Sequence, residues 1–287
     1  MAGGNGSQAT GHVRVSRNGD IGEVLLDNPA RRNPLSLAVL RDLITAVGGF
    51  GADPAVRVIV VSGTSPAFSA GHDLAEMVDR SDAFYEELFD VCCELMAMIR
   101  SVPQPVVAAV DGIATAAGCQ VVAACDLVVA TDRSRFAVPG VRIGLFCSVP
   151  MVPLSRAIGR KRALEMLLTG DPIDAATAAE WGLVNRVVPA GELQEAVADL
   201  AGRIGRFSAG VLAIGKRAFY EQLDRAEPEA YEHTRQVMAA NAAMDDAQEG
   251  IGAFLEKRPP VWPAPPPVWP APPPVWPAPP PGDPAAV

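Results

Sequence analysis

Two short runs of small residues in this sequence could present backbone N–H groups to an oxygen that becomes negatively charged. FSAGHDLAEM, from Phe68 to Met77, and GIATAAGCQVV, from Gly112 to Val122, each follow an apolar segment and precede a predicted helix start. The first N–H groups of a helix lack intrahelical acceptors and attract negative charge. Two such runs facing one another would form a two-donor oxyanion hole. Taken singly, each run is more typical of a tight strand-to-helix turn.

The apolar pattern predicts an α/β core that positions these runs. Residues 12–27 alternate around Asn18-Gly19, which favours a β-hairpin. A helix is predicted over 35–50, with Ser36 as its N-cap. Near-continuous Val, Ile and Ala runs predict strands that are covered on both faces, at 56–63, 105–112 and 126–131.

The pattern becomes helical after about residue 150, with helices predicted over 160–168, 174–181 and 192–207 and one short apolar segment, LVNRVVP, among them. Two or three amphipathic helices and no strand are predicted from Ser208 to Arg258. The predicted organisation is a flexible N-terminus (1–11), an α/β core (12–204), a C-terminal helical region (205–258) and a disordered tail (259–287).

The predicted tail contains VWPAPPP three times in tandem, beginning at Val261, Val268 and Val275. Proline this dense favours polyproline II or disorder, and three residues per turn would move successive tryptophans to different faces. The repeats are interpreted either as a neutral duplication or as a ligand for proline-reading domains.

Composition excludes several classes of protein. A net charge of −9 and a pI near 4.9 argue against nucleic acid as a partner. No membrane span is expected, because Asp111, Gln120 and Asp126 interrupt the longest apolar region. The five cysteines are expected to be reduced and buried, and the first ten residues lack the marks of a signal or transit peptide. The sequence therefore predicts a cytoplasmic protein.

Five motifs, in this order, resemble the landmarks of the crotonase (enoyl-CoA hydratase/isomerase) superfamily: NPARRNPLS, FSAGHDLAEM, PVVAAVDGIATAAGCQVVAACDLVVA, FAVPGVRIGL and GIGAFLEKRPP. The resemblance runs from about Val13 to Arg258. SAGHDL, ATAAGCQ, PGVRIGLFCS and FLEKRPPVW are most similar to the enoyl-CoA hydratase domain-containing protein 3 group. The resemblance implies an α/β fold, a crotonase-like ββα spiral core with a C-terminal helical trimerisation region.

The resemblance also implies roles for individual residues in fatty acid metabolism. The N–H groups of His72 and Ala117 would hold the carbonyl oxygen of a coenzyme A thioester as it becomes an enolate. Contacts with the acyl-CoA or enoyl-CoA substrate are implied for six further positions, Arg31, Ala70, Gly71, Asp73, Leu74 and Gly118. No metal and no separate cofactor is implied, since coenzyme A is part of the substrate.

Two residues of the last predicted helix are implied to act between subunits. Phe254 and Lys257 would reach the coenzyme A of a neighbouring subunit. The implied assembly is a homotrimer, or a hexamer built as a dimer of trimers.

Two positions depart from the superfamily's hydratase pattern. Its two glutamates, which hold the added water as base and acid, fall on Gln120 in AAGCQ and Gly140 in VPG. Proton transfer needs a group that titrates near the working pH; an amide does not, and glycine has no side chain. The resemblance therefore implies thioester binding with weak or absent hydration.

Other residues are weighed as replacements. Asp73 and Glu76 are nearby carboxylates, whereas Asp111 and Asp126 are expected to be structural. Cys147, beside Ser148 in GLFCSVP, has no evident basic neighbour that would activate its thiol, and the side chain of His72 is expected to pack.

Three functional hypotheses stay open. The first is an enzyme working through an enolate, by weak hydration, isomerisation or thioester hydrolysis. The second is a non-catalytic acyl-CoA binder or carrier. The third is an interaction protein that acts through its Pro/Trp repeats.

Overall fold

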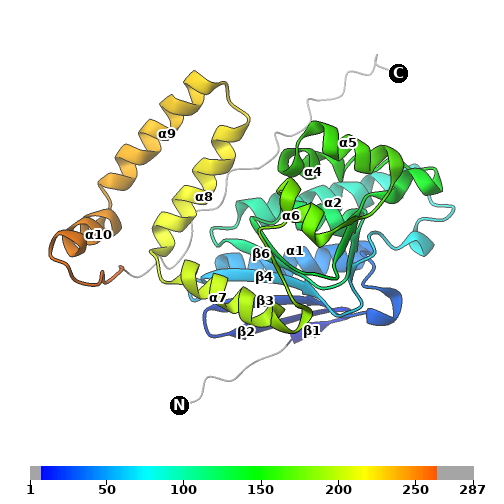
Figure 1. Ribbon diagram of the computed structural model, residues 1–287, viewed down its shortest axis with the longest axis horizontal. Helices are drawn as coiled ribbons and strands as arrows, with labels where there is room; N and C mark the ends of the chain where they lie inside the picture. Colours follow the sequence, from blue (N-terminus) through cyan, green and yellow to red (C-terminus); the bar gives the residue numbers. More distant parts are fainter. Residues whose placement is uncertain (1–7, 264–287) are drawn as a thin grey trace.

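The larger of two β-sheets holds the apolar strands at the centre of the molecule (Figure 1). The computed structural model describes residues 8–263. This sheet has the strand order β1-β2-β3-β4-β6-β8-β11; β1 to β3 pair antiparallel and the remaining pairs are parallel. Its strands are β1 Gln8–Thr10, β2 Val13–Asn18, β3 Ile21–Leu26, β4 Val58–Gly63, β6 Val106–Val110, β8 Leu127–Thr131 and β11 Arg186–Val188.

The predicted hairpin and the three buried strands are confirmed. Asn18 pairs with Ile21 across the turn. Alternate residues of β4 face opposite sides of the sheet: Ile59 and Val61 belong to the main core, while Val58 and Val60 pack with Val197 on the other side. Burial on both faces explains why these strands are apolar throughout instead of alternating.

A second, four-stranded sheet has the order β10-β9-β7-β5. Its strands are β5 Ala67–Ser69, β7 Ile113–Thr115, β9 Arg135–Ala137 and β10 Ile173–Asp174, and β5, β7 and β9 are parallel. Sequence analysis does not predict this sheet, because strands of two or three residues are too short to show a period. Strand β5 opens the first small-residue run, β7 lies within the second, and β9 ends just before Gly140. The carboxyl ends of these parallel strands therefore bring the three segments to one edge.

Ten α-helices cover the sheets and form the C-terminal region of the described chain (Figure 1). They are α1 Leu37–Ala52, α2 Asp82–Ser101, α3 Ala117–Ala124, α4 Met151–Ile158, α5 Arg160–Thr169, α6 Ala175–Trp181, α7 Leu193–Gly205, α8 Ala209–Leu223, α9 Glu227–Ala242 and α10 Asp245–Leu255. Four 3-10 helices are η1 Pro29–Arg31, η2 Leu74–Glu76, η3 Pro139–Ile143 and η4 Ala190–Glu192.

Helix starts agree with prediction at α1 and α3 and differ after the first small-residue run. The hydroxyl of Ser36 accepts a hydrogen bond from the N–H of Val39, as expected of the N-cap of α1. The first run, however, leads only into the single turn η2. Asp79 adopts φ = 52°, a left-handed conformation that a right-handed helix cannot continue through, and α2 begins beyond it at Asp82.

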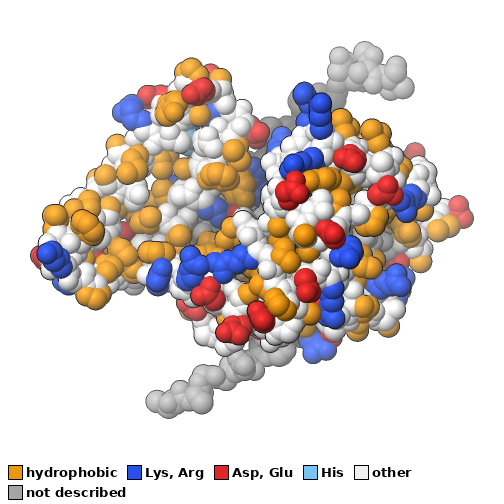
Figure 2. Space-filling view, viewed as in Figure 1, with side chains coloured by type: hydrophobic (Ala, Val, Ile, Leu, Met, Phe, Trp, Pro, Cys, Tyr) orange, Lys and Arg blue, Asp and Glu red, His pale blue; other side chains and the backbone are white. Residues whose placement is uncertain are grey.

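Helices α8 to α10 extend away from the sheets (Figure 1), and exposed hydrophobic side chains lie along them (Figure 2). The ammonium of Lys216 on α8 anchors them to the core, because it lies 2.7 Å from a carboxylate oxygen of Asp126 and donates to the carbonyls of Ile99 and Gln104 at 2.9 Å each. The phenol of Tyr220 donates to the same Asp126 at 2.7 Å. Asp126 is therefore structural, as predicted.

The first VWPAPPP repeat begins within the described residues. The indole N–H of Trp262 donates to the carbonyl of Arg206 at 2.8 Å, and the N–H of Val261 donates to the carboxylate of Glu249 at 2.7 Å. Trp262, which sequence analysis assigned to the disordered tail, thus packs against the helical region. The predictions for Trp269 and Trp276, and for the flexible N-terminus up to residue 7, lie outside the described residues. None of the helices within residues 8–263 has the length and hydrophobicity needed to cross a bilayer.

Candidate active site

The two small-residue runs lie against one another. A Cβ on Gly71, whose φ is +89°, would lie 2.8 Å from the Cβ of Ala116 and 3.0 Å from the carbonyl oxygen of Thr115. The Thr115 hydroxyl donates to the carbonyl of Ala70 at 3.0 Å, which ties the two runs together. A Cβ on Gly118 would lie 2.5 Å from the carbonyl oxygen of Ser69. Only glycine at both positions allows this close approach.

Two backbone donors are left open where the runs meet. Leu35 N–H donates to the carbonyl of Gly71, and Asp73 N–H donates to that of Leu35. The N–H of His72, between them, enters no backbone hydrogen bond among the described residues. Ala117 begins α3, so its N–H has no intrahelical acceptor, and no other backbone acceptor is recorded within residues 8–263.

Both donor residues line a pocket of about 570 Å³. Its wall is mainly apolar and includes Ala70, Leu74 and Ala116 from the runs. The other lining residues come from the end of η2, from α2, and from η3 and the segment after it: Met77, Phe89, Pro139, Gly140, Arg142, Ile143, Leu145, Phe146, Cys147, Ser148, Val149 and Pro150. A mainly apolar wall with a few converging polar groups is typical of a small-molecule site.

Gln120 lies behind this wall and does not line the pocket. Its side chain is 1% exposed. The thiol of Cys92 on α2 donates to its Oε1 at 3.6 Å, and its Nε2 has no partner. The amide of Gln120 therefore lies between α3, which carries it, and α2, which carries Cys92.

Gly140 lines the pocket, but the structure leaves no room for a side chain there. A Cβ would lie 2.6 Å from the carbonyl oxygen of Leu145 and 2.8 Å from Sγ of Cys147. Distances below 3.0 Å require the neighbouring backbone to move.

The nearby carboxylates are engaged elsewhere. Asp73 accepts from both terminal nitrogens of Arg31 at 2.8 Å, and Glu76 accepts from the N–H of Leu37 at 3.0 Å. Neither lines the pocket, and among the described residues no Asp or Glu does. Asp111 pairs with Arg133 and is structural, as predicted.

The imidazole of His72 is held on the pocket side of α2. Its Nδ1 lies 3.3 Å from the carbonyl oxygen of Leu35, and its ring meets that of Phe89 edge-on, with centroids 5.6 Å apart. Burial lowers the pKa of this imidazole. The ring therefore packs against Phe89, as expected, and both residues line the pocket.

Cys147 also lines the pocket, and its thiol is a candidate nucleophile. Burial raises the pKa of its thiol, which keeps it protonated at neutral pH. Arg142, the one cation in the wall among the described residues, forms an ion pair with Asp171. The thiol therefore has no basic partner there, which agrees with the prediction that it is not a nucleophile.

Phe254 and Lys257 do not line the pocket. The Phe254 side chain, at the end of α10, is 82% exposed, and Lys257 follows that helix. Helix α10 projects from the sheets that carry the pocket (Figure 1). In this chain these residues are not part of the same site.

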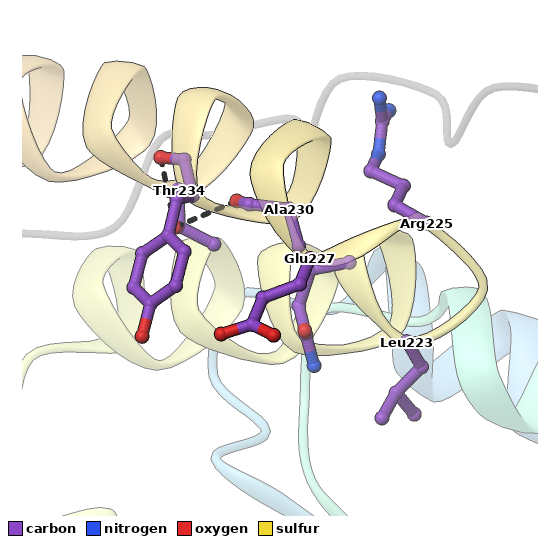
Figure 3. Close-up of a pocket in the computed structure, with 7 residues that line it drawn as sticks. Leu223, Arg225, Glu227, Ala230 and Thr234 are labelled. Carbon is purple, nitrogen blue, oxygen red and sulfur yellow. Dashed lines mark hydrogen bonds between the residues drawn. The ribbon is translucent and has the colours of Figure 1, made fainter.

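A second hollow, of about 400 Å³, lies at the turn from α8 to α9. Figure 3 shows the side chains of Arg225 and Glu227 pointing away from one another there. The Thr234 hydroxyl donates within its own helix to the carbonyl of Ala230 at 2.8 Å. This hollow lies away from the two open N–H groups of His72 and Ala117, which line the apolar pocket, so the apolar pocket is the candidate site.

Sequence reasoning missed several lining residues, Met77, Phe89 and Arg142 among them. Phe89 follows helical spacing in α2 and looks like any core aromatic. The segment 145–150 was partly indicated by the GLFCS motif, but only the fold shows that it closes over Gly140.

Comparison with known proteins agrees with this geometry. The family model described as "Enoyl-CoA hydratase/isomerase" matches residues 16–265. The chain belongs to the enoyl-CoA hydratase/isomerase family. The predicted membership of the crotonase superfamily is thereby confirmed, and the relatives described next confirm its fold and the likeness to the domain-containing protein 3 group.

Individual relatives cover most of the chain. The mouse protein named "Enoyl-CoA hydratase domain-containing protein 3, mitochondrial" is 46% identical over 91% of this chain and 88% of its own length. The crystal structure of human enoyl Coenzyme A hydratase domain-containing protein 3 has a TM-score of 0.85 at 46% identity, covering 88% of this chain and all of that one. A Mycobacterium smegmatis enoyl-CoA hydratase has a TM-score of 0.86 at 44% identity, with 88% and 99% coverage.

The predicted cytoplasmic location is wrong on these findings. The mouse relative is named mitochondrial, and matching rat, human, Xenopus laevis and zebrafish relatives carry the same word. The prediction rested on the composition of ten terminal residues, which is a weak signal for a cellular address.

Proposed function

We propose that the chain binds acyl-CoA or enoyl-CoA thioesters of fatty acid metabolism. The thioester oxygen accepts hydrogen bonds from the backbone N–H groups of His72 and Ala117, and the acyl chain occupies the apolar pocket. The observation that carries this proposal is the pair of open N–H groups beside an apolar cavity. Preorganised donors of this kind stabilise an enolate oxygen strongly, because they need no reorganisation when the charge develops.

Hydration of a 2-enoyl-CoA is weak or absent in this proposal. Hydration needs one group to deprotonate water and one to protonate carbon, and among the described residues no carboxylate lines the pocket. A missing acid–base group typically costs about 10²- to 10⁴-fold in rate. Cavity shape around Gly140 supports this, because a glutamate has no space there.

The remaining substrate contacts extend the same proposal. The ion pair of Arg31 and Asp73 and the exposed side chain of Leu74 are suited to the adenine and pantetheine parts of coenzyme A. Phe254 and Lys257 reach a neighbouring subunit's ligand in a homotrimer or hexamer. The exposed apolar residues of α8 to α10 support such an assembly, which sedimentation velocity on the full chain tests.

A non-catalytic acyl-CoA carrier is the second candidate, favoured by the same absence of a lining carboxylate among residues 8–263. Titration calorimetry with octanoyl-CoA tests both candidates. Binding is expected, and the absence of measurable heat and affinity would contradict both.

A further inference from the structure

A pocket that stabilises an enolate still needs a group to accept the α-proton. Three of its lining residues carry titratable side chains: His72, Arg142 and Cys147. A guanidinium does not lose its proton in proteins. The Cys147 thiol stays protonated, because burial raises its pKa. The hydroxyl of Ser148 donates to the carbonyl of Phe146 at 3.4 Å and is not a base at neutral pH.

The contacts of His72 fix which nitrogen is free. Its Nδ1 lies 3.3 Å from the carbonyl oxygen of Leu35. A carbonyl only accepts hydrogen bonds, so Nδ1 carries the hydrogen and Nε2 carries the lone pair. The edge-on contact with Phe89, at an interplanar angle of 84°, holds the ring in this orientation.

The surroundings of the ring keep it uncharged. Burial lowers its pKa from 6.5, the opposing influences of the Leu35 carbonyl and the Glu76 carboxylate being smaller. The neutral form, which is the one that accepts a proton, is therefore the main form at neutral pH.

We propose that the imidazole of His72 is the base of this pocket, exchanging a proton at the α-carbon of the bound thioester. This inference rests on the proposed function. Nε2 takes the α-proton, the electron pair of that C–H bond forms the enolate C=C bond, and the carbonyl π pair moves onto the oxygen held by the two N–H groups. The imidazolium then returns a proton to the same carbon or, when the substrate is a 3-enoyl thioester, to the γ-carbon, which moves the double bond to the 2-position.

One residue thus contributes two functions. Its backbone N–H faces the thioester oxygen, and its side chain serves the adjacent carbon, which is separated from that oxygen only by the thioester carbon. The two functions are separable by mutation, because a substitution at His72 removes the imidazole and keeps the N–H.

Deuterium incorporation at C2 of octanoyl-CoA in D2O, followed by mass spectrometry, tests the inference. The comparison uses the full chain, H72Q, H72F and, as a matched control, H12Q, which changes an exposed histidine in the turn before β2. H72Q retains a donor for the Leu35 carbonyl, and H72F retains the aromatic contact with Phe89, so at least one is expected to fold. We expect exchange to fall about 10²- to 10⁴-fold in both, with octanoyl-CoA still bound because the backbone N–H of residue 72 is retained, and H12Q to equal the wild type.

The outcomes separate this inference from the proposed function. Failure of the wild-type chain to bind octanoyl-CoA overturns both. Binding without α-exchange in the wild type, or exchange in folded H72Q or H72F at the wild-type rate, overturns the assignment of His72 alone. Partial recovery of exchange when free imidazole is added to H72A supports it further.

Discussion

At Gly140 a Cβ would come within 2.6 Å of the Leu145 carbonyl oxygen and 2.8 Å of the Cys147 sulfur. Leu145 and Cys147 occupy the space that a side chain at position 140 would need. The close packing of the wall there and the lack of a carboxylate at this position therefore both follow from the glycine. Gln120, which matches the other glutamate position, is packed between helices and does not line the wall.

Gly140→Ala is expected to lower the free energy of unfolding by about 1–3 kcal/mol, the usual cost of overpacking. Urea denaturation measures it. Gly202→Ala is the control, because Gly202 lies exposed in α7 with nothing within 4 Å of its added Cβ, and alanine there should stabilise slightly. Equal free energies of unfolding for Gly140→Ala and the wild type would show that Leu145 and Cys147 move to accommodate a side chain at no cost.

The lowered pKa of His72 predicts a pH dependence of stability. The unfolded state takes up the proton near pH 6.5 and the folded state only at lower pH, so the unfolded state binds more protons between the two values. The contribution to stability is present above pH 6.5 and is lost as the pH falls toward the folded pKa. Glu76 is the charged group acting on this ring. Urea denaturation between about pH 7.5 and 5 should show that the free energy of unfolding falls less steeply with decreasing pH in H72F than in the wild type. Identical slopes for the two proteins would contradict a lowered pKa of His72.

At the scale of elements, the long or strongly patterned segments were predictable and the short ones were not. The hairpin of β2 and β3, the buried strands and helix α1 follow from period and turn chemistry. The β5-β7-β9 sheet depends on long-range pairing of three-residue strands, which leaves no local signal. That sheet is what brings His72 and Ala117 together, so the site was predictable only through the family motifs.

Helix α8 is tied to the core by Lys216, whose side chain is 7% exposed, and by the phenol of Tyr220, which donates to the same Asp126. Lys216→Met is expected to lower the free energy of unfolding by about 3–5 kcal/mol, because it leaves the Asp126 carboxylate, only 13% exposed, without its cation. Lys161→Met, at an exposed lysine of α5, is the matched control and should change stability little. An effect of Lys216→Met no larger than that of the control in urea denaturation would show that the ion pair does not hold α8.

At the scale of the whole molecule, Trp262 is the last residue within 8–263 for which a hydrogen bond to the helical region is seen. Deleting residues 264–287 should leave the urea midpoint and the Kd for octanoyl-CoA unchanged. Trp262→Ala should lower the free energy of unfolding by about 1 kcal/mol or more, because it removes the hydrogen bond to Arg206 and the packing on Gly250. A deletion that destabilises as much as Trp262→Ala would assign the remaining repeats a structural role.

The candidate pocket lies where the carboxyl ends of β5, β7 and β9 meet, whereas helices α8 to α10, with their exposed hydrophobic side chains, project from the sheets (Figure 1). Under the proposed function, the two open N–H groups account for thioester binding, and the lack of a lining carboxylate within residues 8–263 accounts for weak hydration. Binding and hydration are therefore expected to be separable in this protein.

Hydration of crotonyl-CoA, measured beside octanoyl-CoA affinity on the same preparation, tests this most directly. We predict binding with hydration at least about 10²-fold slower than an ordinary hydratase, and little gain from Gln120→Glu, because Gly140 still provides no second carboxylate. Crotonyl-CoA hydration at ordinary enzyme rates would contradict the account.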